Sequence, residues 1–496
     1  MPVLSIRVFE EIFSTLASNF RPAFSRSAAY ENFRLALLTF MTSIERKGVT
    51  DTARLLPDNF DFSDRDRCYE AMIKFFKRSD AFDHKSLWRI LAEIMRDSNL
   101  LYRDKESGRC FLVIDGHNVI KSGRRMPCVG KMTQHSETPS KPKNTFGHLV
   151  GSLGVIAGSE NTKLSCFLIA GEIQSGEDQI RVWNREDEMA LASHIVKMLK
   201  MVRVATETFK HCFLLGDSYF FTDPALTIIK HHNALHPDRT IVMISKAKRN
   251  CVAWTPAPEK VPGQVGRPHI RGNKVHPWEL FDDEDAFTEV TIKLYGKEEK
   301  TKYRELILLW GKNYTPVKFV LTVSDRGMAI LVCTDITVNA ITIITSYSRR
   351  WKVEASFKVS SQDTKAFNYH FWSKAQEKLD RFASSSDPDP LLAVEEKDRK
   401  AIMNTFRAYE RFISISFIAQ SLLQLIALIL EERGYESKMW LRTKRGTVVS
   451  VGNLIHDLHY LILFGLGSLV DLPKLDKMKK DDSPLTENSH RLLNVS

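Results

Sequence analysis

Short apolar runs that alternate with segments of helical spacing constrain the fold of this 496-residue chain most strongly. The strand-like runs are Cys110–Ile114, Leu149–Ala157, Leu164–Ala170, Cys212–Leu215 and Thr240–Ile244. Helical spacing occupies Asp187–Ala205 and Asp223–His232, each of which lies between two of the later runs. Three strands followed by alternating helices and strands predict an α/β fold around one mixed sheet.

Residues 251–335 interrupt the alternation. A loop rich in Pro and Gly comes first, up to Gly272, and such residues mark turns and extended chain. Four strand-like segments follow: Thr288–Leu294, Arg304–Trp310, Val317–Val323 and Met328–Cys333. We therefore expect a β-rich insertion, after which a helix runs from about Val338 to beyond Phe357.

The regions on either side of the α/β part are predicted to be helical. Residues 1–108 carry helical spacing and several basic side chains, so this region is expected to bind DNA; a solvated charged face explains the same charges. The expected parts are 1–108, a core from 109 to 250, the insertion 251–335, a return helix within 336–383, a linker at 384–400 and a helical region 401–496 that ends in a charged tail.

Composition narrows the class of protein. The chain has 71 Lys and Arg against 60 Asp and Glu, a net charge of +11, which permits a nucleic-acid partner without requiring one. Hydrophobic residues make up 43% of the chain, which excludes a mainly disordered protein. Seven scattered cysteines without a CxxC pair indicate a reducing compartment, and the acids near the N-terminus argue against a signal peptide. We expect a cytoplasmic protein.

One uncharged stretch of 19 residues, Phe412–Leu430, is long enough to cross a membrane. It contains three serines and two glutamines, which favours a buried helix of a large domain over a membrane span. The phosphate-binding pattern GxxxxGK[ST] is absent from the sequence, so nothing supports an ATP-driven activity.

Two aspartates follow apolar strand-like runs. Asp115 comes directly after Phe111–Ile114, and Asp217 follows Cys212–Gly216. If the two strands are neighbours, both carboxylates lie at the same edge of the sheet, where they can share Mg²⁺ or Mn²⁺. A pair of such ions serves phosphoryl transfer. The alternative is structural, with Asp115 in a turn and Asp217 capping a helix.

A third carboxylate lies in the predicted return helix. At about 100° per residue, Tyr347, Arg350 and Glu354 share one helix face within roughly 60°. That face presents a possible metal ligand beside a phenol and a guanidinium, both of which donate well to phosphate oxygens. An ordinary surface ion pair between Arg350 and Glu354 accounts for the same spacing.

These residues carry a family resemblance. The chain resembles bacterial insertion-sequence transposases of the DDE type, in the subgroup with a Tyr-x2-Arg-x3-Glu-x6-Lys signature, here Tyr347, Arg350 and Glu354. Asp115-Gly116 with the loop from Lys121 to Pro127 resembles the family's block around its first aspartate. Further similar blocks, between about 110 and 445, are Lys141-Pro142, Gly147-His148, Gly216-Asp217, Ser245–Asn250, Gly266-Arg267-Pro268 and Trp440–Thr443.

The resemblance implies a ribonuclease-H-like core in which Asp115 lies on the first strand, Asp217 after the fourth and Glu354 on the return helix. These three acids are then the catalytic residues and the ligands of two Mg²⁺ ions, which Mn²⁺ can replace. The family nicks the ends of its element, and the freed 3′-hydroxyl attacks the opposite strand, typically forming a hairpin, and finally target DNA. Terminal inverted repeats, target DNA and a second copy of the chain are the implied partners, with no membrane.

The resemblance also implies DNA contacts. Tyr347 and Arg350 match positions that hold the DNA end by its phosphate, but the signature lysine is replaced by Ser361. We hypothesise that Lys358 or Lys365, which share that helix face if the helix continues, supplies the missing ammonium. Other predicted phosphate contacts, for which solvated charges are the alternative, are Lys121, Arg124, Arg125, Lys246, Lys248, Arg249 and Arg267.

Some residues and activities stay open at this stage. Trp254, Trp278 and Trp310 are candidates to stack on a flipped base, or belong to the core of the insertion. His117 and His148 are expected to be structural, because two-metal phosphoryl transfer needs no histidine base. A structure-specific nuclease and a transposase-derived DNA-binding protein without catalysis are the competing functions.

Overall fold

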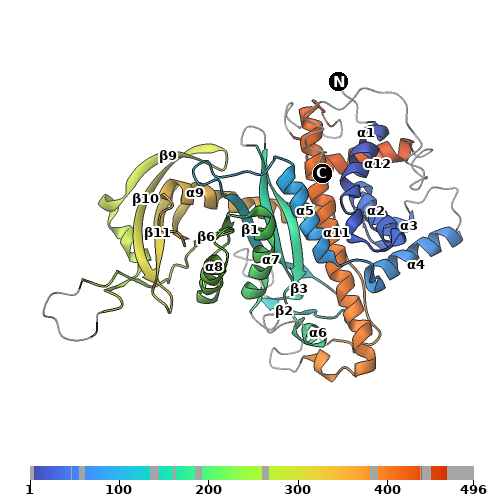
Figure 1. Ribbon diagram of the computed structural model, residues 1–496, viewed down its shortest axis with the longest axis horizontal. Helices are drawn as coiled ribbons and strands as arrows, with labels where there is room; N and C mark the ends of the chain where they lie inside the picture. Colours follow the sequence, from blue (N-terminus) through green and yellow to red (C-terminus); the bar gives the residue numbers. More distant parts are fainter. Residues whose placement is uncertain are drawn as a thin grey trace. The chain divides into compact units, whose positions relative to one another are not determined.

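The computed structural model describes most of the chain, as traced in Figure 1. The described residues are 5–45, 47–54, 62–133, 144–159, 163–184, 193–259, 267, 269–379, 389–435, 437 and 448–465. The chain divides into two compact units. Unit 1 comprises Met1–Tyr102, Gly116–Lys197 and Ala355–Ser496, and unit 2 comprises Arg103–Asp115 and Met198–Glu354.

Unit 2 is built on a mixed sheet. Its strands follow the order β1 (Cys110–Ile120), β5 (Cys212–Leu215), β6 (Ile241–Lys246), β12 (Gly327–Cys333), β11 (Thr315–Ser324), β10 (Lys297–Trp310), β7 (Ala253–Trp254) and β8 (Lys274–Val275), and β9 (Thr288–Leu294) pairs with β10. The first three are parallel, with Cys110 opposite Cys212 and Cys212 opposite Ile241. From β12 on the pairing is antiparallel. The predicted α/β class with a mixed sheet is confirmed.

Helices connect the parallel strands of unit 2. Helix α7 (His194–Phe209), most of which belongs to unit 2, comes directly before β5 in the chain. Helix α8 (Asp223–Leu235) joins β5 to β6. Where the three parallel strands pair with one another, at Cys110–Val113, Cys212–Leu215 and Ile241–Ile244, their residues are apolar and buried, as expected when both faces of a sheet are covered. The polar side chains of these strands follow the paired segments.

The four strands predicted for the insertion are all present as β9 to β12, and they extend the sheet of unit 2. Cys333 on β12 lies opposite Ile244 on β6, so an inserted strand pairs directly with the last parallel strand. The structure adds two strands that the sequence pattern did not predict here, β7 and β8. Two 3₁₀ segments, Pro277–Asp282 and Glu284–Ala286, lead into β9.

Unit 1 contains the helical N-terminal and C-terminal regions and a group of antiparallel strands. Its strands are β2 (Gly130–Thr133), β3 (Asn144–Ser159), β4 (Lys163–Ile173) and the second half of β1. Its helices are α1 (Ile6–Ser18), α2 (Ser27–Thr42), α3 (Val49–Arg54), α4 (Phe62–Arg78), α5 (His84–Asp97), α6 (Asp178–Trp183), most of α10 (Lys352–Gln362), α11 (Glu396–Glu432) and α12 (Val451–Gly465). Helices α1 to α5 lie in the region 1–108, which was predicted to be helical.

Helix α11 forms the centre of unit 1, where it packs on β4 and on α2, α4, α5 and α12 (Figure 1). Among the helices that the structure describes, it is the one that is long and apolar enough to cross a membrane, but its apolar window is entirely buried. Its polar side chains have partners inside the protein. Gln420 accepts from Ser360 Oγ at 2.7 Å and donates to Ser356 O at 3.1 Å. These observations support the prediction of a buried core helix.

Several elements differ from their predicted bounds. Strand β1 continues to Ile120, so Asp115 lies within the strand and not after its end. Because β2 was not predicted, β5 is the fifth strand of the chain and not the fourth. The return helix consists of α9 (Ala340–Ser348), a 3₁₀ turn at Arg349–Trp351, and α10 (Lys352–Gln362). The charged tail, residues 384–388 of the predicted linker and the Trp440–Thr443 block lie outside the described residues, whereas the rest of the linker contains a 3₁₀ turn at Pro390–Ala393 and the start of α11.

Candidate active site

The three predicted catalytic acids all belong to unit 2, and each stands where an apolar element ends or changes partner. Asp115 follows the last residues of β1 that pair with β5, where Val113 lies opposite Leu215. Asp217 comes two residues after β5, and Glu354 lies in the first turn of α10. Because β1 and β5 are parallel and in this register, Asp115 and Asp217 both follow the carboxyl ends of the paired segments, and they lie at the same end of these two strands.

The guanidinium of Arg350 joins two of these acids. Its Nη1 lies 3.2 Å from Asp115 Oδ2, and its Nη2 lies 2.5 Å from Glu354 Oε1. The side chains of Arg350 and Asp115 are each 17% exposed, whereas that of Glu354 is 39% exposed. The predicted common face of Arg350 and Glu354 is therefore present, and it is directed at Asp115.

Tyr347 and Asp217 complete the surroundings of the guanidinium. Burial raises the pKa of the Tyr347 phenol to about 12, and a hydrogen bond between its side chain and Arg350 acts in the opposite direction. Burial also raises the pKa of Asp217, and Glu354 contributes to the rise, whereas Arg350 and Lys248 oppose it. A carboxylate that is desolvated beside another carboxylate gains from a nearby cation, so this group of side chains favours positive charge.

Part of Asp217 also has a structural role. Its Oδ1 accepts from the backbone N–H of Tyr219 at 2.9 Å, and its carbonyl accepts from Ser245 Oγ at 2.7 Å. These bonds fix the loop after β5 relative to the end of β6. The predicted alternative of a local cap is thus partly correct, since one carboxylate oxygen closes a turn, although α8 begins only at Asp223.

The chemistry of these donors suits a hard divalent cation, because Mg²⁺ and Mn²⁺ prefer carboxylate oxygens. In the described part of the chain, however, the group of three ligand atoms found within 4.8 Å of one another lies elsewhere, at His84, Glu172 and Glu410. Between Asp115 and Glu354 stands the guanidinium of Arg350 instead. Metal binding by the three acids requires Arg350 to release at least one carboxylate.

The His84, Glu172 and Glu410 group is buried in unit 1 and was not predicted from the sequence. Burial lowers the pKa of His84 to about 4, so its imidazole is neutral. Each carboxylate already faces a cation: Lys85 Nζ lies 3.1 Å from Glu172 Oε1, and Arg181 Nη2 lies 3.6 Å from Glu410 Oε1. The three residues come from α5, β4 and α11, far apart in the chain, and no spacing in the sequence connects them.

Most of the basic residues predicted to contact DNA from unit 2 are accessible. Lys248, Arg249 and Arg267 are exposed, and Lys246 is half-buried at the end of β6. The Arg249 guanidinium lies 4.6 Å from the centre of the Trp278 ring. Among the tryptophans, Trp310 stacks on Phe221 at 4.0 Å, which supports its assignment to the core. Trp254 lies beneath Arg271, 4.8 Å from its guanidinium.

Of the predicted basic loop in unit 1, only Arg124 is fully exposed. The ammonium of Lys121 is buried and donates to Phe367 O at 2.5 Å and Tyr369 O at 2.9 Å, so it is not presented to a phosphate. Burial lowers the pKa of Lys121 to about 7. Arg125 Nη1 donates to Lys374 O and Gln376 O at 2.9 and 3.1 Å. Both residues hold the segment 367–376 in place, a role that the sequence did not reveal.

The two histidines weighed as bases have structural partners in unit 1. His148 is buried, 2.7 Å from Tyr369 Oη and 2.8 Å from Pro127 O. His117 lies against the rings of Phe357 and Phe367. Of the two candidates for the missing lysine, Lys358 is exposed on α10, whereas Lys365 lies beyond the end of that helix with φ of 54°. The expectation that Lys365 shares the helix face is therefore wrong.

No protein-family model matches the chain, and no curated protein matches it. The inference of function therefore depends on the convergence of Asp115, Asp217 and Glu354 at Arg350 and on the ordered motifs of the sequence.

Proposed function

We propose that this chain is a DNA transposase of the DDE type, which binds the ends of an insertion sequence, cuts the strands there and transfers the freed ends to target DNA. One observation supports the proposal above all others. Three carboxylates separated by 102 and 137 positions in the sequence, Asp115, Asp217 and Glu354, surround one guanidinium in the order that the motifs predict.

The fold is consistent with the proposal that the core is ribonuclease-H-like. Antiparallel β3 and β4 in unit 1 are followed along the chain by the parallel strands β5 and β6, which alternate with α7 and α8. The strand that carries Asp115 pairs in parallel with the strand before Asp217. The third acid follows β12 on a helix, after the inserted strands.

Asp115, Asp217 and Glu354 are the residues that would hold two Mg²⁺ ions. When bound, such a pair activates an attacking oxygen and neutralises the leaving oxygen of a phosphodiester. The raised pKa of Asp217 fits this role, because desolvation makes its carboxylate depend on nearby positive charge. In the nicking step, an oxygen from water bonds to phosphorus and the bond between phosphorus and the 3′-oxygen breaks. The 3′-oxygen takes up a proton, which leaves a 3′-hydroxyl for strand transfer.

Arg350 and Tyr347 are assigned to the phosphate of the DNA end. In the structure the two terminal nitrogens of the guanidinium contact two different carboxylates, and two oxygens of one phosphate can accept from the same pair of nitrogens. Arg350 exchanges a carboxylate for a phosphate most easily at Glu354, which is more exposed than Asp115 and Arg350. The exposed cations Lys248, Arg249 and Arg267 then supply salt-dependent contacts along the DNA backbone. We place this activity in the cytoplasm, on chromosomal DNA, with two copies of the chain bridging the element ends.

The test is strand cleavage of a DNA fragment that carries the flanking ends of the chain's own gene, with Mg²⁺ or Mn²⁺. Wild type is compared with Asp217→Ala and with Asp325→Ala, a control at an exposed aspartate in the turn between β11 and β12. We expect metal-dependent nicking at one end of the repeat by wild type and by the control. The Asp217 variant should bind the same DNA and leave it uncut.

The other outcomes separate the competing functions. Cleavage of the ends without joining of the 3′-hydroxyl to a second DNA would indicate a structure-specific nuclease. Binding of the ends without any cleavage by wild type would indicate a DNA-binding protein that has lost catalysis. Equal cleavage by wild type and by the Asp217 variant would remove the three acids from the mechanism.

A further inference from the structure

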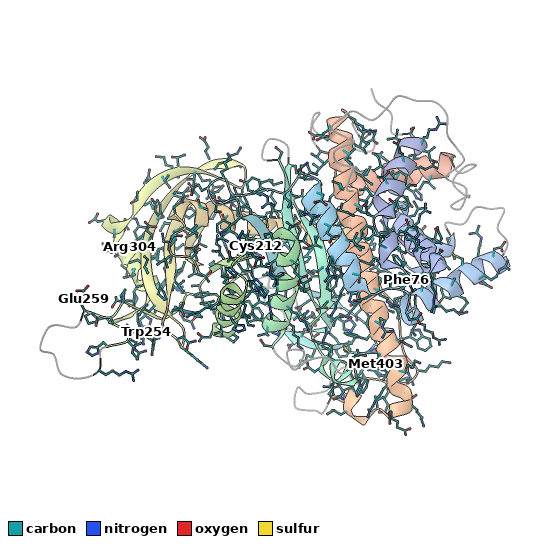
Figure 2. All side chains as sticks on the ribbon, viewed as in Figure 1. Phe76, Cys212, Trp254, Glu259, Arg304 and Met403 are labelled. Atoms are coloured by element: carbon teal, nitrogen blue, oxygen red, sulfur yellow. The ribbon has the colours of Figure 1, made fainter. Side chains whose placement is uncertain are left out.

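A basic groove with an exposed tryptophan lies within unit 1. Its volume is about 1050 Å³, and it is formed by α4, the segment 370–375 and the first turns of α11. In Figure 2, Phe76 marks α4 and Met403 marks this part of α11. Six of its lining residues are Lys or Arg and three are acidic, so the groove is positively charged.

Two ion pairs with residues outside the groove lining, one of an acid and one of a cation, leave this excess of positive charge unchanged. Asp80, one of the three acids of the groove, already pairs with Arg26 at 3.0 Å. Among the cations, Lys397 pairs with Glu395 at 2.6 Å. Burial lowers the pKa of Lys77, and Arg78 lowers it further. Arg407 likewise contributes to the lowered pKa of the adjacent buried Arg411. Cations that disfavour one another in this way are stabilised by an anion that enters the groove.

The tryptophan is held on a fixed support. Trp372 is 52% exposed, although both of its neighbours, Phe371 and Ser373, are buried. Its carbonyl accepts from Lys77 Nζ at 3.2 Å, and Ser373 N donates to Arg125 O at 3.0 Å. Phe371 packs against Phe76 with ring centres 5.7 Å apart. The backbone is thus fixed on both sides, while a large indole surface faces solvent.

We infer that this groove binds single-stranded DNA, with phosphates on Lys400 and Arg407 and an unstacked base on the Trp372 ring. Cations along a groove combined with an exposed aromatic side chain are the features that bind single strands without regard to sequence. A duplex keeps its bases stacked and cannot use the indole in this way. The inference deepens the proposed function, because the strand separation at a cut end produces such a ligand.

The experiment measures the binding of a fluorescein-labelled dT12 oligonucleotide and of a 12-base-pair duplex by anisotropy, in EDTA, across a series of salt concentrations. The variants are Trp372→Ala, Trp372→Phe and the pair Lys400→Gln with Arg407→Gln. Lys74→Gln is the control, because Lys74 is an exposed cation of α4 outside the groove lining. Thermal unfolding of each variant verifies that it is folded.

For dT12 we expect Trp372→Ala to weaken binding by roughly 5- to 100-fold and Trp372→Phe to retain most of it. The double variant should weaken binding and lower the slope of log K against log salt by about 1.4, since each single-strand phosphate contact contributes about 0.7. Lys74→Gln should bind as wild type does. Absence of dT12 binding, or equal binding by Trp372→Ala, would overturn the inference, as would a duplex that depends on Lys400 and Arg407 as strongly as dT12 does.

Failure of this inference and failure of the proposed function give different results. If wild type cleaves element ends in a metal-dependent way but the Trp372 and lysine–arginine variants bind dT12 as wild type does, the inference about the groove is wrong and the proposed transposase function stands. If dT12 binding depends on Trp372 but wild type cleaves no DNA, the inference about the groove stands and the proposed transposase function is wrong.

Discussion

Two groups of carboxylates with arginine partners, one in each unit, differ in how freely their charges can change partner. In unit 2, Arg350 joins Asp115 and Glu354, and the side chain of Glu354 is 39% exposed. In unit 1, Glu172, Glu177 and Glu410 face Lys85, Lys197 and Arg181, and the three carboxylates are at most 8% exposed. The residue types are similar, but of these carboxylates only Glu354 in unit 2 is exposed to solvent.

The comparison shows that proximity alone is a poor guide to a metal site. The ligand atoms of His84, Glu172 and Glu410 are within 4.8 Å of one another, yet fixed cations already balance the two carboxylates. A divalent cation there would add uncompensated charge to a buried region, which is costly. At Arg350 one of the paired carboxylates, Glu354, is 39% exposed, so under the proposed function we expect the guanidinium to exchange it for a phosphate when cations bind the acids. We therefore expect changes in unit 2 to affect activity and changes in unit 1 to affect stability.

The largest expected effect is the loss of cleavage in Glu354→Gln. The substitution keeps the shape of the side chain but removes a carboxylate from the proposed metal ligands, and several kcal/mol of transition-state stabilisation correspond to roughly 10³-fold or more in rate. Stability should change by less than about 1 kcal/mol, because the ion pair with Arg350 is partly exposed. Cleavage rates and urea unfolding measured on the same preparation examine both statements. A variant that cuts normally, or that unfolds, would contradict the comparison.

The converse substitution is Glu177→Gln in unit 1. Its side chain is fully buried, 2.7 Å from Lys197 Nζ and 3.7 Å from Arg181 Nε. Removing its charge leaves Lys197 with Asp178 at 2.6 Å and Arg181 with Glu410 at 3.6 Å as their remaining ionic partners, so we expect a cost of at most about 3 kcal/mol. Urea unfolding should show this loss, whereas Glu31→Gln, which breaks a partly exposed pair with Arg34, should cost less than about 1 kcal/mol. Similar stabilities for the two variants would show that the buried network contributes no more than a surface pair.

Acid should destabilise unit 1 through its buried histidines. Burial lowers the pKa of His84 to about 4 and that of His148 to about 3, from an ordinary value of 6.5. The unfolded chain therefore binds protons below pH 6.5 that the folded chain does not, and stability falls as pH decreases from 6.5 toward 4. At pH 5 each histidine contributes about 2 kcal/mol to this loss.

Unfolding free energies at pH 7 and pH 5 test this prediction. The difference between the two pH values should shrink in His84→Gln and in His148→Gln, which cannot be protonated. The control His231→Gln alters an exposed histidine of α8 and should keep the wild-type difference. Around His84 the facing groups are Asp83, Glu172, Glu410, Lys85 and Arg411, so acids that protonate in the same range add to the wild-type slope. An unchanged slope in both variants would mean that neither imidazole is kept neutral by the fold.

Local sequence patterns predicted the elements of unit 2 well. β5 and β9 have the bounds that their apolar runs indicated, because a short apolar run between turn residues leaves little choice of conformation. The common face of Arg350 and Glu354 was also predictable, since it depends only on helical periodicity. The roles of Lys121 and Arg125 were not, because their acceptors are backbone carbonyls about 250 residues away, which no side-chain pattern records. The buried network of unit 1 escaped prediction for the same reason.

The smallest expected effect concerns the lysine that takes over the role of the signature lysine, because the signature position is occupied by Ser361. Lys358 is exposed on α10, where a helical turn separates it from Glu354, whereas Lys365 follows the helix in a left-handed conformation. We expect Lys358→Ala to weaken binding of element ends by about 3-fold and to lower the salt slope by about 0.9, the effect of one phosphate contact on a duplex. Lys365→Ala should bind as wild type does. If neither variant changes binding, no lysine replaces the signature residue, and the phosphate of the DNA end is left to Arg350 and Tyr347.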